Sequence, residues 1–135
     1  MNRHGQAALI GFTSSTDFPT YRALNSTYSG SLTDAFVVLL DRSGEQPRFS
    51  TYLGGTGDEY GYSITIGCRN SIWVGGSTSS KDFPLAQAFQ PAYAGGPFDA
   101  FLSRILNHDD PAEGAVCFSH VNEGHERGCS GDDVN

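Results

Sequence analysis

Two stretches of the sequence, FTSSTDFPTYRALNSTYSGSLTDAFVVLL (residues 12–40) and STSSKDFPLAQAFQPAYAGGPFDAFLSRI (residues 77–105), repeat one pattern at an offset of 65 positions. From position 11 to 36, 13 of 26 residues are identical to the residue 65 places later, with no gap. A long ungapped match at a fixed offset is typical of a repeated supersecondary unit. The repeat therefore predicts an architecture made of stacked copies of one unit.

The unit itself is predicted to consist of short β-strands. YGYSITIG (residues 60–67) alternates large and small side chains, which is typical of a strand with one buried face. β-Branched and aromatic residues also predict strands in SIWVGG (71–76), DAFLSRIL (99–106) and RFSTYLGG (48–55). The first copy of the DAF strand, DAFVVLL (34–40), is apolar throughout, which predicts cover on both faces. Four short antiparallel strands per unit are typical of a propeller blade.

The sequence thus predicts an all-β fold of antiparallel four-stranded propeller blades, about two in number, which is an incomplete propeller. Residues 1–106 form the repeat region, with the first blade entered at its second strand (7–55) and the second blade over 60–106. Residues 107–135 are predicted to hold a degenerate last strand and an acidic, disordered tail, because this stretch carries a charge of −6 and few large apolar residues. A ring needs about four blades or more, so we expect other blades or copies of this chain as partners.

Four motifs resemble the bacterial SBBP-type β-propeller repeat, and they occur in the order of that repeat: FSTYLGGTGDEYGYSITI, VGGSTSSKDFP, AFQPAYAGG and DAFLSRI. The resemblance covers Ala7 to about Leu106. It implies a multi-bladed propeller of which this chain is a fragment of about two blades. It also implies a large secreted or surface-associated bacterial protein, hence an extracellular or cell-surface location. It supplies no catalytic residues, so no enzyme is expected.

The recurring residues are expected to serve the fold. An Asp before Phe-Pro can accept hydrogen bonds from backbone N–H groups, the Phe can fill space between blades, and the Asp of DAF can cap its strand. The residues given this structural role are Asp17, Phe18, Pro19, Asp34, Phe36, Asp82, Phe83, Pro84, Asp99 and Phe101. The paired glycines are expected to permit turns with positive φ. Trp73, in mid-strand, is expected in the core rather than on a ligand platform.

A zinc site is the main alternative function. The segment CFSHVNEGHERGC places Cys117, His120, His125 and Cys129 at spacings that resemble a CCHC zinc knuckle, and two thiolates with two imidazoles suit tetrahedral zinc. This segment differs from the zinc knuckle in two ways: His120 stands where the knuckle has a cysteine, and the spacer before the last cysteine is one residue shorter. The competing interpretation is a degenerate outer strand with solvated histidines.

Other chemistry has weaker support, so no cofactor is expected beyond zinc or calcium as alternatives. The acidic turns Gly57–Glu59 and Gly131–Asp133 could attract calcium, but the D-x-[DN]-x-[DN]-G loop is missing. GGTGDEYG (54–61) lacks the Lys and the following helix of a phosphate loop. An active site in a propeller channel needs titratable groups converging at an axis, which two blades do not build.

The composition of the chain limits the classes of partner that it can bind. The net charge of −7 opposes nucleic-acid binding, which needs a cationic face. The longest apolar runs, Ala7–Phe12 and Ala35–Leu40, are far shorter than the roughly 20 residues of a membrane helix, and no signal peptide is visible. Three cysteines do not form a disulfide framework. The leading function is therefore a non-catalytic repeat module that acts as a scaffold or as an interaction surface for a protein or glycan.

Overall fold

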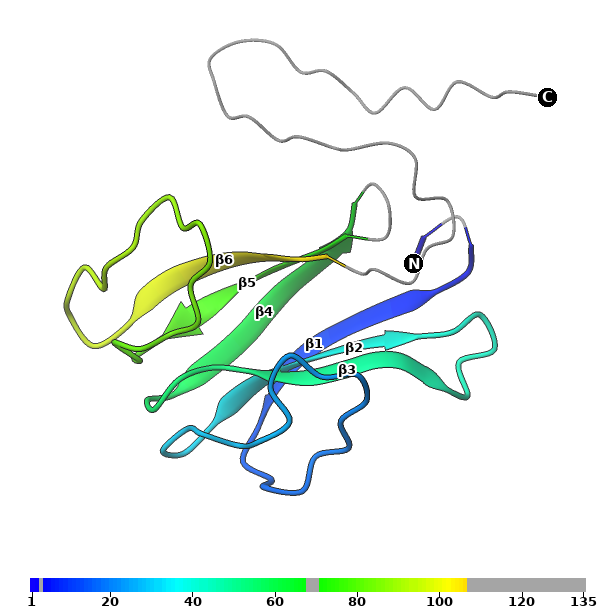
Figure 1. Ribbon diagram of the computed structural model, residues 1–135, viewed down its shortest axis with the longest axis horizontal. Coiled ribbons are helices and arrows are strands. Elements are labelled where there is room, and N and C mark those ends of the chain that lie inside the picture. The colour runs from blue at the N-terminus through cyan, green and yellow to red at the C-terminus, as the bar shows by residue number, and fades with distance from the viewer. Residues whose placement is uncertain (3, 68–70, 107–135) are drawn as a thin grey trace, which may run out of the picture.

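The computed structural model describes residues 1–2, 4–67 and 71–106, which form two antiparallel three-stranded sheets and no helix (Figure 1). Sheet A has the strand order β1-β2-β3, and sheet B has the order β4-β5-β6. The strands are β1 Ala7–Thr13, β2 Asp34–Leu40, β3 Pro47–Leu53, β4 Glu59–Ile66, β5 Ile72–Thr78 and β6 Asp99–Ile105. The predicted all-β fold is confirmed. The predicted four-stranded blade is not seen, because each sheet has three strands in this part of the chain.

The sequence repeat is a structural repeat as well. The pairing of β1 with β2 recurs residue for residue in the pairing of β5 with β6, 65 positions later. The end pairs are Ala7↔Leu40 and Thr13↔Asp34 in sheet A, and Ile72↔Ile105 and Thr78↔Asp99 in sheet B. The unusual backbone of the intervening loops repeats too, since Arg22 and Gln87 have φ of 50° and 52°. Equivalent residues therefore occupy equivalent places in the two sheets.

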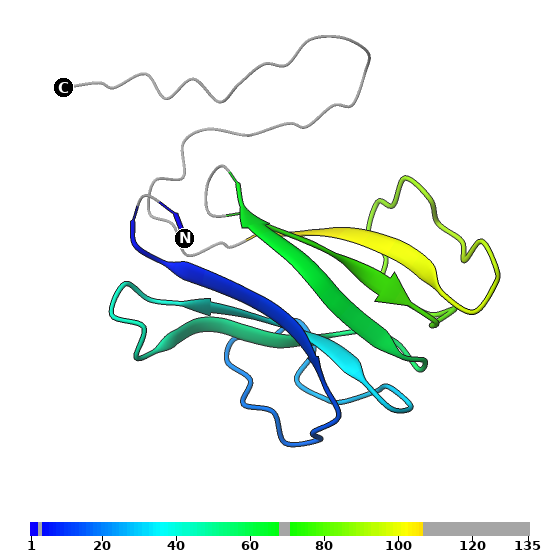
Figure 2. The same ribbon diagram turned by 180° about the vertical axis from the view of Figure 1, so that it is seen from behind.

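The sheets stack face to face, with β1 lying beside β4 in both views (Figures 1 and 2). The sheets approach closely at Gly61, where a Cβ atom would lie 2.7 Å from Ile10 Cδ1. The Phe12 and Tyr60 rings meet edge to face with centroids 4.9 Å apart. The buried core between the sheets consists of Ala35, Val37, Leu39, Phe49, Leu53, Ile72, Val74, Phe83, Phe101 and Ile105. Burial of this apolar area is the main stabilising term for the stack.

Strand β2 is covered less evenly than its apolar sequence predicts. Ala35, Val37 and Leu39 are fully buried against sheet B, whereas Phe36 and Val38 on the other face are only partly buried. The hairpin that follows β2 is closed by Asp41, whose Oδ1 accepts hydrogen bonds from the Gly44 N–H (2.9 Å) and the Ser43 hydroxyl (2.7 Å). The face of β2 that carries Phe36 and Val38 is therefore only partly covered.

Strand β4 departs from the simple alternation that the sequence predicts. The register shifts between Gly61 and Ser63, so Tyr62 is an extra residue opposite β5. Such a bulge turns the following side chains to the other face. Tyr62 is consequently 67% exposed, while Ile64 and Ile66 pack against the core. The prediction that Tyr60, Tyr62, Ile64 and Ile66 share one buried face is wrong at Tyr60 and Tyr62 for this reason, since Tyr60 pairs with Ser77, on the opposite face from Ile64 and Ile66.

Two long loops, residues 14–33 and 79–98, connect β1 to β2 and β5 to β6. Each places its Phe-Pro phenylalanine against the DAF phenylalanine, with ring centroids 4.7 Å apart for Phe18 and Phe36 and 4.6 Å apart for Phe83 and Phe101. The first loop is also fastened to β3 by Tyr52, whose hydroxyl accepts from the Phe18 N–H (2.9 Å) and donates to the Ser15 carbonyl (2.7 Å). The loops are thus anchored at their bases.

The glycine pairs have two different roles. Gly95 and Gly96 have positive φ (109° and 84°), as predicted for a turn. Gly54 and Gly55 do not; they are glycines because acidic side chains approach them closely, and a Cβ on Gly55 would lie 2.5 Å from Asp82 Oδ1. Steric room, rather than backbone conformation, explains this second pair.

Candidate functional site

The turn that joins the two sheets, residues 54–58, is hydrogen-bonded to both long loops. Asp58 Oδ1 accepts hydrogen bonds from the Leu32 N–H (2.7 Å) and the Ser31 hydroxyl (3.0 Å) of the first loop. Asp82 Oδ1, in the second loop, accepts from the Thr56 N–H (2.9 Å) and hydroxyl (3.0 Å) of the turn. The two aspartates therefore tie both loops to one connection between the sheets.

Glu59 is fully buried beside this turn. Its Oε1 accepts hydrogen bonds from the hydroxyls of Thr78 (2.6 Å) and Ser80, and its Oε2 accepts from the Gly55 N–H (3.2 Å). The Glu59 N–H donates to the Thr33 carbonyl at 3.0 Å. Donors on three sides stabilise a carboxylate without a cation. Sequence reasoning considered Glu59 only as part of an acidic turn and missed this structural role.

Asp34 and Asp99 occupy equivalent positions at the start of β2 and β6. Asp34 Oδ2 accepts from the Ser29 N–H at 2.9 Å, and Asp99 Oδ2 accepts from the Ala94 N–H, so each closes the end of its long loop. Asp34 is fully buried, whereas Asp99 is partly exposed. Burial raises the pKa of Asp34, and the Ser29 N–H lowers it in part. The charge at Asp34 is therefore held at a cost in solvation.

The two aspartates that tie the loops to the turn, Asp58 and Asp82, behave in the opposite way. The Leu32 N–H is the largest influence on the pKa of Asp58 and lowers it, with partial burial working against this effect. The Thr56 N–H and then its hydroxyl lower the pKa of Asp82. These hydrogen bonds favour the ionised form. We therefore expect the turn between the sheets to be most stable when both carboxylates are ionised.

We expect Asp58→Asn to lower the free energy of unfolding at pH 7 by about 1 kcal/mol, because neutral hydrogen bonds replace charge-assisted ones. A group whose pKa is lowered by folding stabilises the fold above its unfolded value and loses that contribution as pH falls through the folded value. Thermal melts of the wild type from neutral pH to about pH 2 should therefore fall more steeply than those of Asp58→Asn.

Asp34→Asn is the matched control because the pKa of Asp34 is raised instead. A raised carboxyl pKa costs stability above the folded value, so removing the charge should leave the protein at least as stable at pH 7. The asparagine oxygen can still accept the Ser29 N–H. Equal losses of melting temperature for the two variants at pH 7 would contradict this assignment.

The structure places the remaining predicted residues as follows. Asp17, Pro19 and Pro84 are exposed in the long loops. Cys117, His120, His125, Cys129 and the turn Gly131–Asp133 lie outside the described residues. Within residues 1–2, 4–67 and 71–106, no three acidic, His or Cys side chains form a group suited to a metal ion. Asp58 and Glu59, the other calcium candidates, have the hydrogen-bond partners given above.

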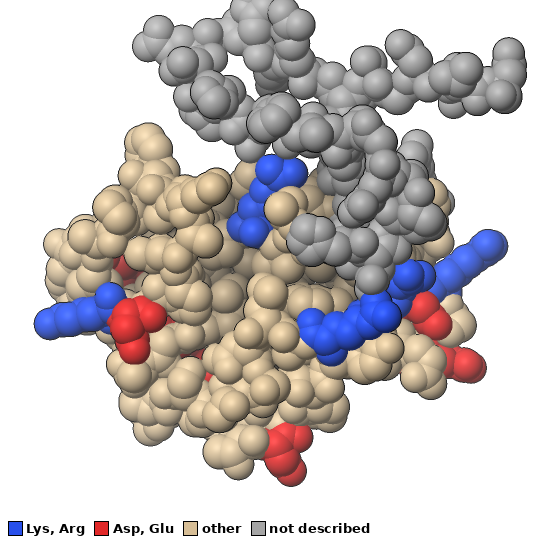
Figure 3. Space-filling view, viewed as in Figure 1, with Lys and Arg blue, Asp and Glu red and all other residues tan. Residues whose placement is uncertain are grey.

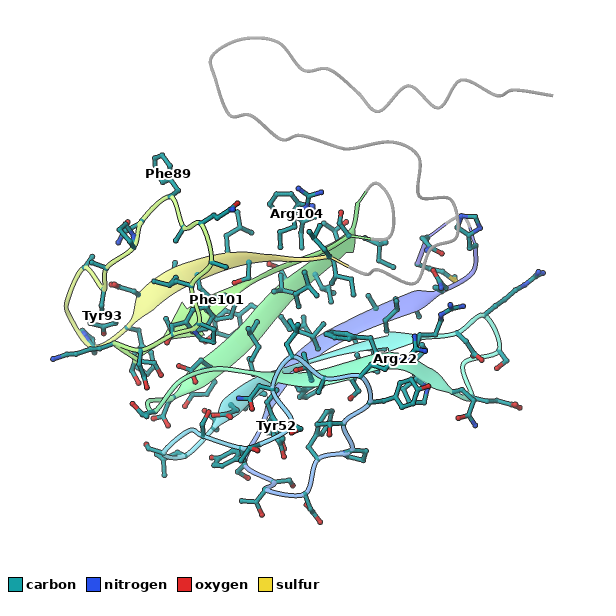
Figure 4. All side chains as sticks on the ribbon, in the orientation of Figure 1. Arg22, Tyr52, Phe89, Tyr93, Phe101 and Arg104 are labelled. Atoms are coloured by element: carbon teal, nitrogen blue, oxygen red, sulfur yellow. The ribbon has the colours of Figure 1, made fainter. Side chains whose placement is uncertain are left out.

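Trp73 lies on a different surface from the one predicted. It is only partly buried and lies on the face of sheet B that points away from sheet A, with the Arg104 guanidinium 5.4 Å from its ring centroid. Figure 4 shows Arg104 on this outer side. Sequence reasoning missed this pair, although the register Trp73↔Arg104 follows from pairing the two strands. The expectation that Trp73 belongs to the core is therefore wrong.

Most of the described surface that Figure 3 shows is uncharged, and its basic groups lie at the left, at the top and along the right of the view. In the described part of the chain, no helix has the length and hydrophobicity needed to cross a bilayer.

No family model matches the chain, and no curated protein shows significant similarity to it. The resemblance to the SBBP-type repeat accordingly depends on the motifs of the sequence.

Proposed function

We propose that this chain is a non-catalytic β-propeller repeat module, in which stacked sheets form a scaffold and the long loops present a surface for a protein or glycan ligand. In line with the SBBP resemblance, the module belongs to a larger secreted or surface-associated bacterial protein. The observation that carries the proposal is the repeat itself. Two sheets that share one strand pair of identical register at an offset of 65 stack face to face, which is the way that propeller blades are arranged.

The loops support the binding part of the proposal because they expose apolar side chains at equivalent positions. Leu24 of the first loop and Phe89 of the second are 65 positions apart, and their exposures are 68% and 105%. Leu32 and Leu85 are also exposed, at 66% and 54%. Figure 4 shows Phe89 projecting from the outer end of its loop. Exposed apolar and aromatic groups on anchored loops are typical of recognition surfaces.

The double variant Leu24→Ser with Phe89→Ser tests this surface. Full-length wild-type chain would be screened against a glycan array and a phage-displayed peptide library, and each ligand found would be titrated against both proteins. We expect the double variant to bind at least about tenfold more weakly, since central aromatic and apolar contacts dominate interfaces. Its circular dichroism should be unchanged, because neither side chain is buried.

Tyr62→Ser is the control, since Tyr62 is 67% exposed but lies on a strand rather than a loop. It should bind like the wild type. Equal binding by the wild type and the double variant, or no ligand from either screen, would overturn the proposal that the loops are the binding surface.

A further inference from the structure

The repeat shows which surface of sheet B lacks the cover that its counterpart has. Val37 and Leu102 occupy the same position in the two units, yet Val37 is fully buried and Leu102 is 73% exposed. Ala35 is fully buried, while its counterpart Ala100 is exposed. The face of sheet A that contains Ala35 and Val37 is covered by sheet B. In sheet B nothing in the described chain covers the equivalent face.

The uncovered surface, which we call the outer face of sheet B, is formed by Trp73, Gly75, Ala100, Leu102 and Arg104. Leu102 pairs with Gly75 at its centre, and Ser63 of β4 lies on the other side of Gly75, so the apolar area lies along β5 and β6. Arg104 covers the Trp73 ring, and its Nε atom is buried with no hydrogen-bond partner among the described residues. A buried donor without an acceptor is unfavourable. The face therefore has both the apolar area and the unmet polar group of an incomplete interface.

Sheet A has the complementary surface. Its outer face carries Leu9 and Leu40, which are equivalent to Val74 and Ile105 of sheet B. Val74 is fully buried and Ile105 is 5% exposed because they pack on sheet A, whereas Leu9 is 43% exposed and Leu40 is partly buried. The outer face of sheet A is therefore equivalent to the face of sheet B that packs on sheet A. It is the counterpart that the outer face of sheet B lacks.

We propose that the occupant of the outer face of sheet B is a second copy of this chain, docked through the outer face of its sheet A. The contact repeats between molecules the stacking that exists within one molecule. Each copy uses a different face, so the interface is heterologous and generates a ring or an open chain of copies. The inference depends on the proposed propeller-repeat function, and propellers of about four to eight blades correspond to rings of about two to four copies.

The size of the contact follows from the strands available. Within the molecule, β4 contributes the closest approach to β1. The described part of sheet A has no strand in the position equivalent to β4. The intermolecular contact is thus smaller than the internal one, and we expect assembly that depends on protein concentration.

Sedimentation velocity of the full chain, over about three decades of concentration up to about 1 mM, tests the proposal. We expect the wild type to shift from 14.4 kDa to a small multiple of that mass. Leu102→Asp and Leu9→Asp should each stay monomeric where the wild type assembles, and an equimolar mixture of the two should form a heterodimer and nothing larger. Leu24→Asp, an equally exposed leucine on a loop, should assemble like the wild type.

Trp73 gives a second measurement that needs no variant. It is the one tryptophan of the chain, so its quenching by acrylamide should weaken as the wild type assembles. A folded wild type that stays monomeric, with constant quenching, would overturn the proposal. Leu9→Asp that still dimerises would also overturn it, because the contact would then join two copies of the same face. Leu102→Asp should bind loop ligands like the wild type, so failure of this interface and failure of the loop surface are distinguishable.

Discussion

Leu39→Ala is expected to lower the free energy of unfolding by about 2–5 kcal/mol, the usual cost of truncating a buried leucine. Leu39 is fully buried between the sheets, where it belongs to the same core as Ile72 and Val74. Its removal leaves a cavity that two paired sheets have little freedom to close. A loss of this size is a large share of the roughly 5–15 kcal/mol that stabilises a small domain. Chemical denaturation monitored by the fluorescence of Trp73 measures it.

Leu102→Ala is the matched control, because Leu102 lies on β6, the strand equivalent to β2, and is 73% exposed. Measured at a concentration where the chain is monomeric, it should change the free energy of unfolding by less than about 0.5 kcal/mol. Similar losses for both variants would contradict the stacking described here, since the two leucines would then have similar environments. A small loss for Leu39→Ala alone would mean that the sheets do not pack through this face.

Much of the fold could be predicted because the two copies of the repeat can be compared with each other. All six strands overlap the predicted segments, with ends that differ by up to two residues, and the equivalence of DAFVVLL and DAFLSRI predicts the equivalence of β2 and β6. The same comparison also bears on the outer face of sheet B. Val37 becomes Leu102, but Leu39 becomes Arg104, and a charged residue at a core position indicates that the second sheet lacks the cover of the first.

The acidic cluster was harder to predict because its contacts are distant in sequence. A glutamate after a Gly-Asp turn is typical of a solvated loop, yet Glu59 is buried by partners 19 and 21 residues away. The bulge at Tyr62 was hidden as well, because the alternation Tyr60, Tyr62, Ile64, Ile66 is satisfied by an unbroken strand. Both features depend on how the second sheet meets the turn, which the local pattern does not specify.

Glu59→Ala is expected to be the most disruptive change at the turn between the sheets, costing about 3 kcal/mol or more, because each unsatisfied buried polar group costs about 1–3 kcal/mol. The substitution leaves the hydroxyls of Thr78 and Ser80 and the N–H of Gly55 without their acceptor. The connection between the sheets should loosen along with the start of the second loop. Hydrogen exchange should show faster exchange of the Gly55 amide, and denaturation should show the global loss.

A double-mutant cycle separates the carboxylate's hydrogen bonds from the loss of side-chain volume. Glu59→Gln keeps the shape, and Thr78→Val removes the donor of the 2.6 Å hydrogen bond to Oε1. If the two groups interact as the structure shows, the double variant should lose less than the sum of the single losses, with a coupling of about 0.5–3 kcal/mol. Strict additivity would mean that Glu59 and Thr78 are independent. The turn would then be held by Asp58 and Asp82 alone, and their asparagine variants would carry the loss instead.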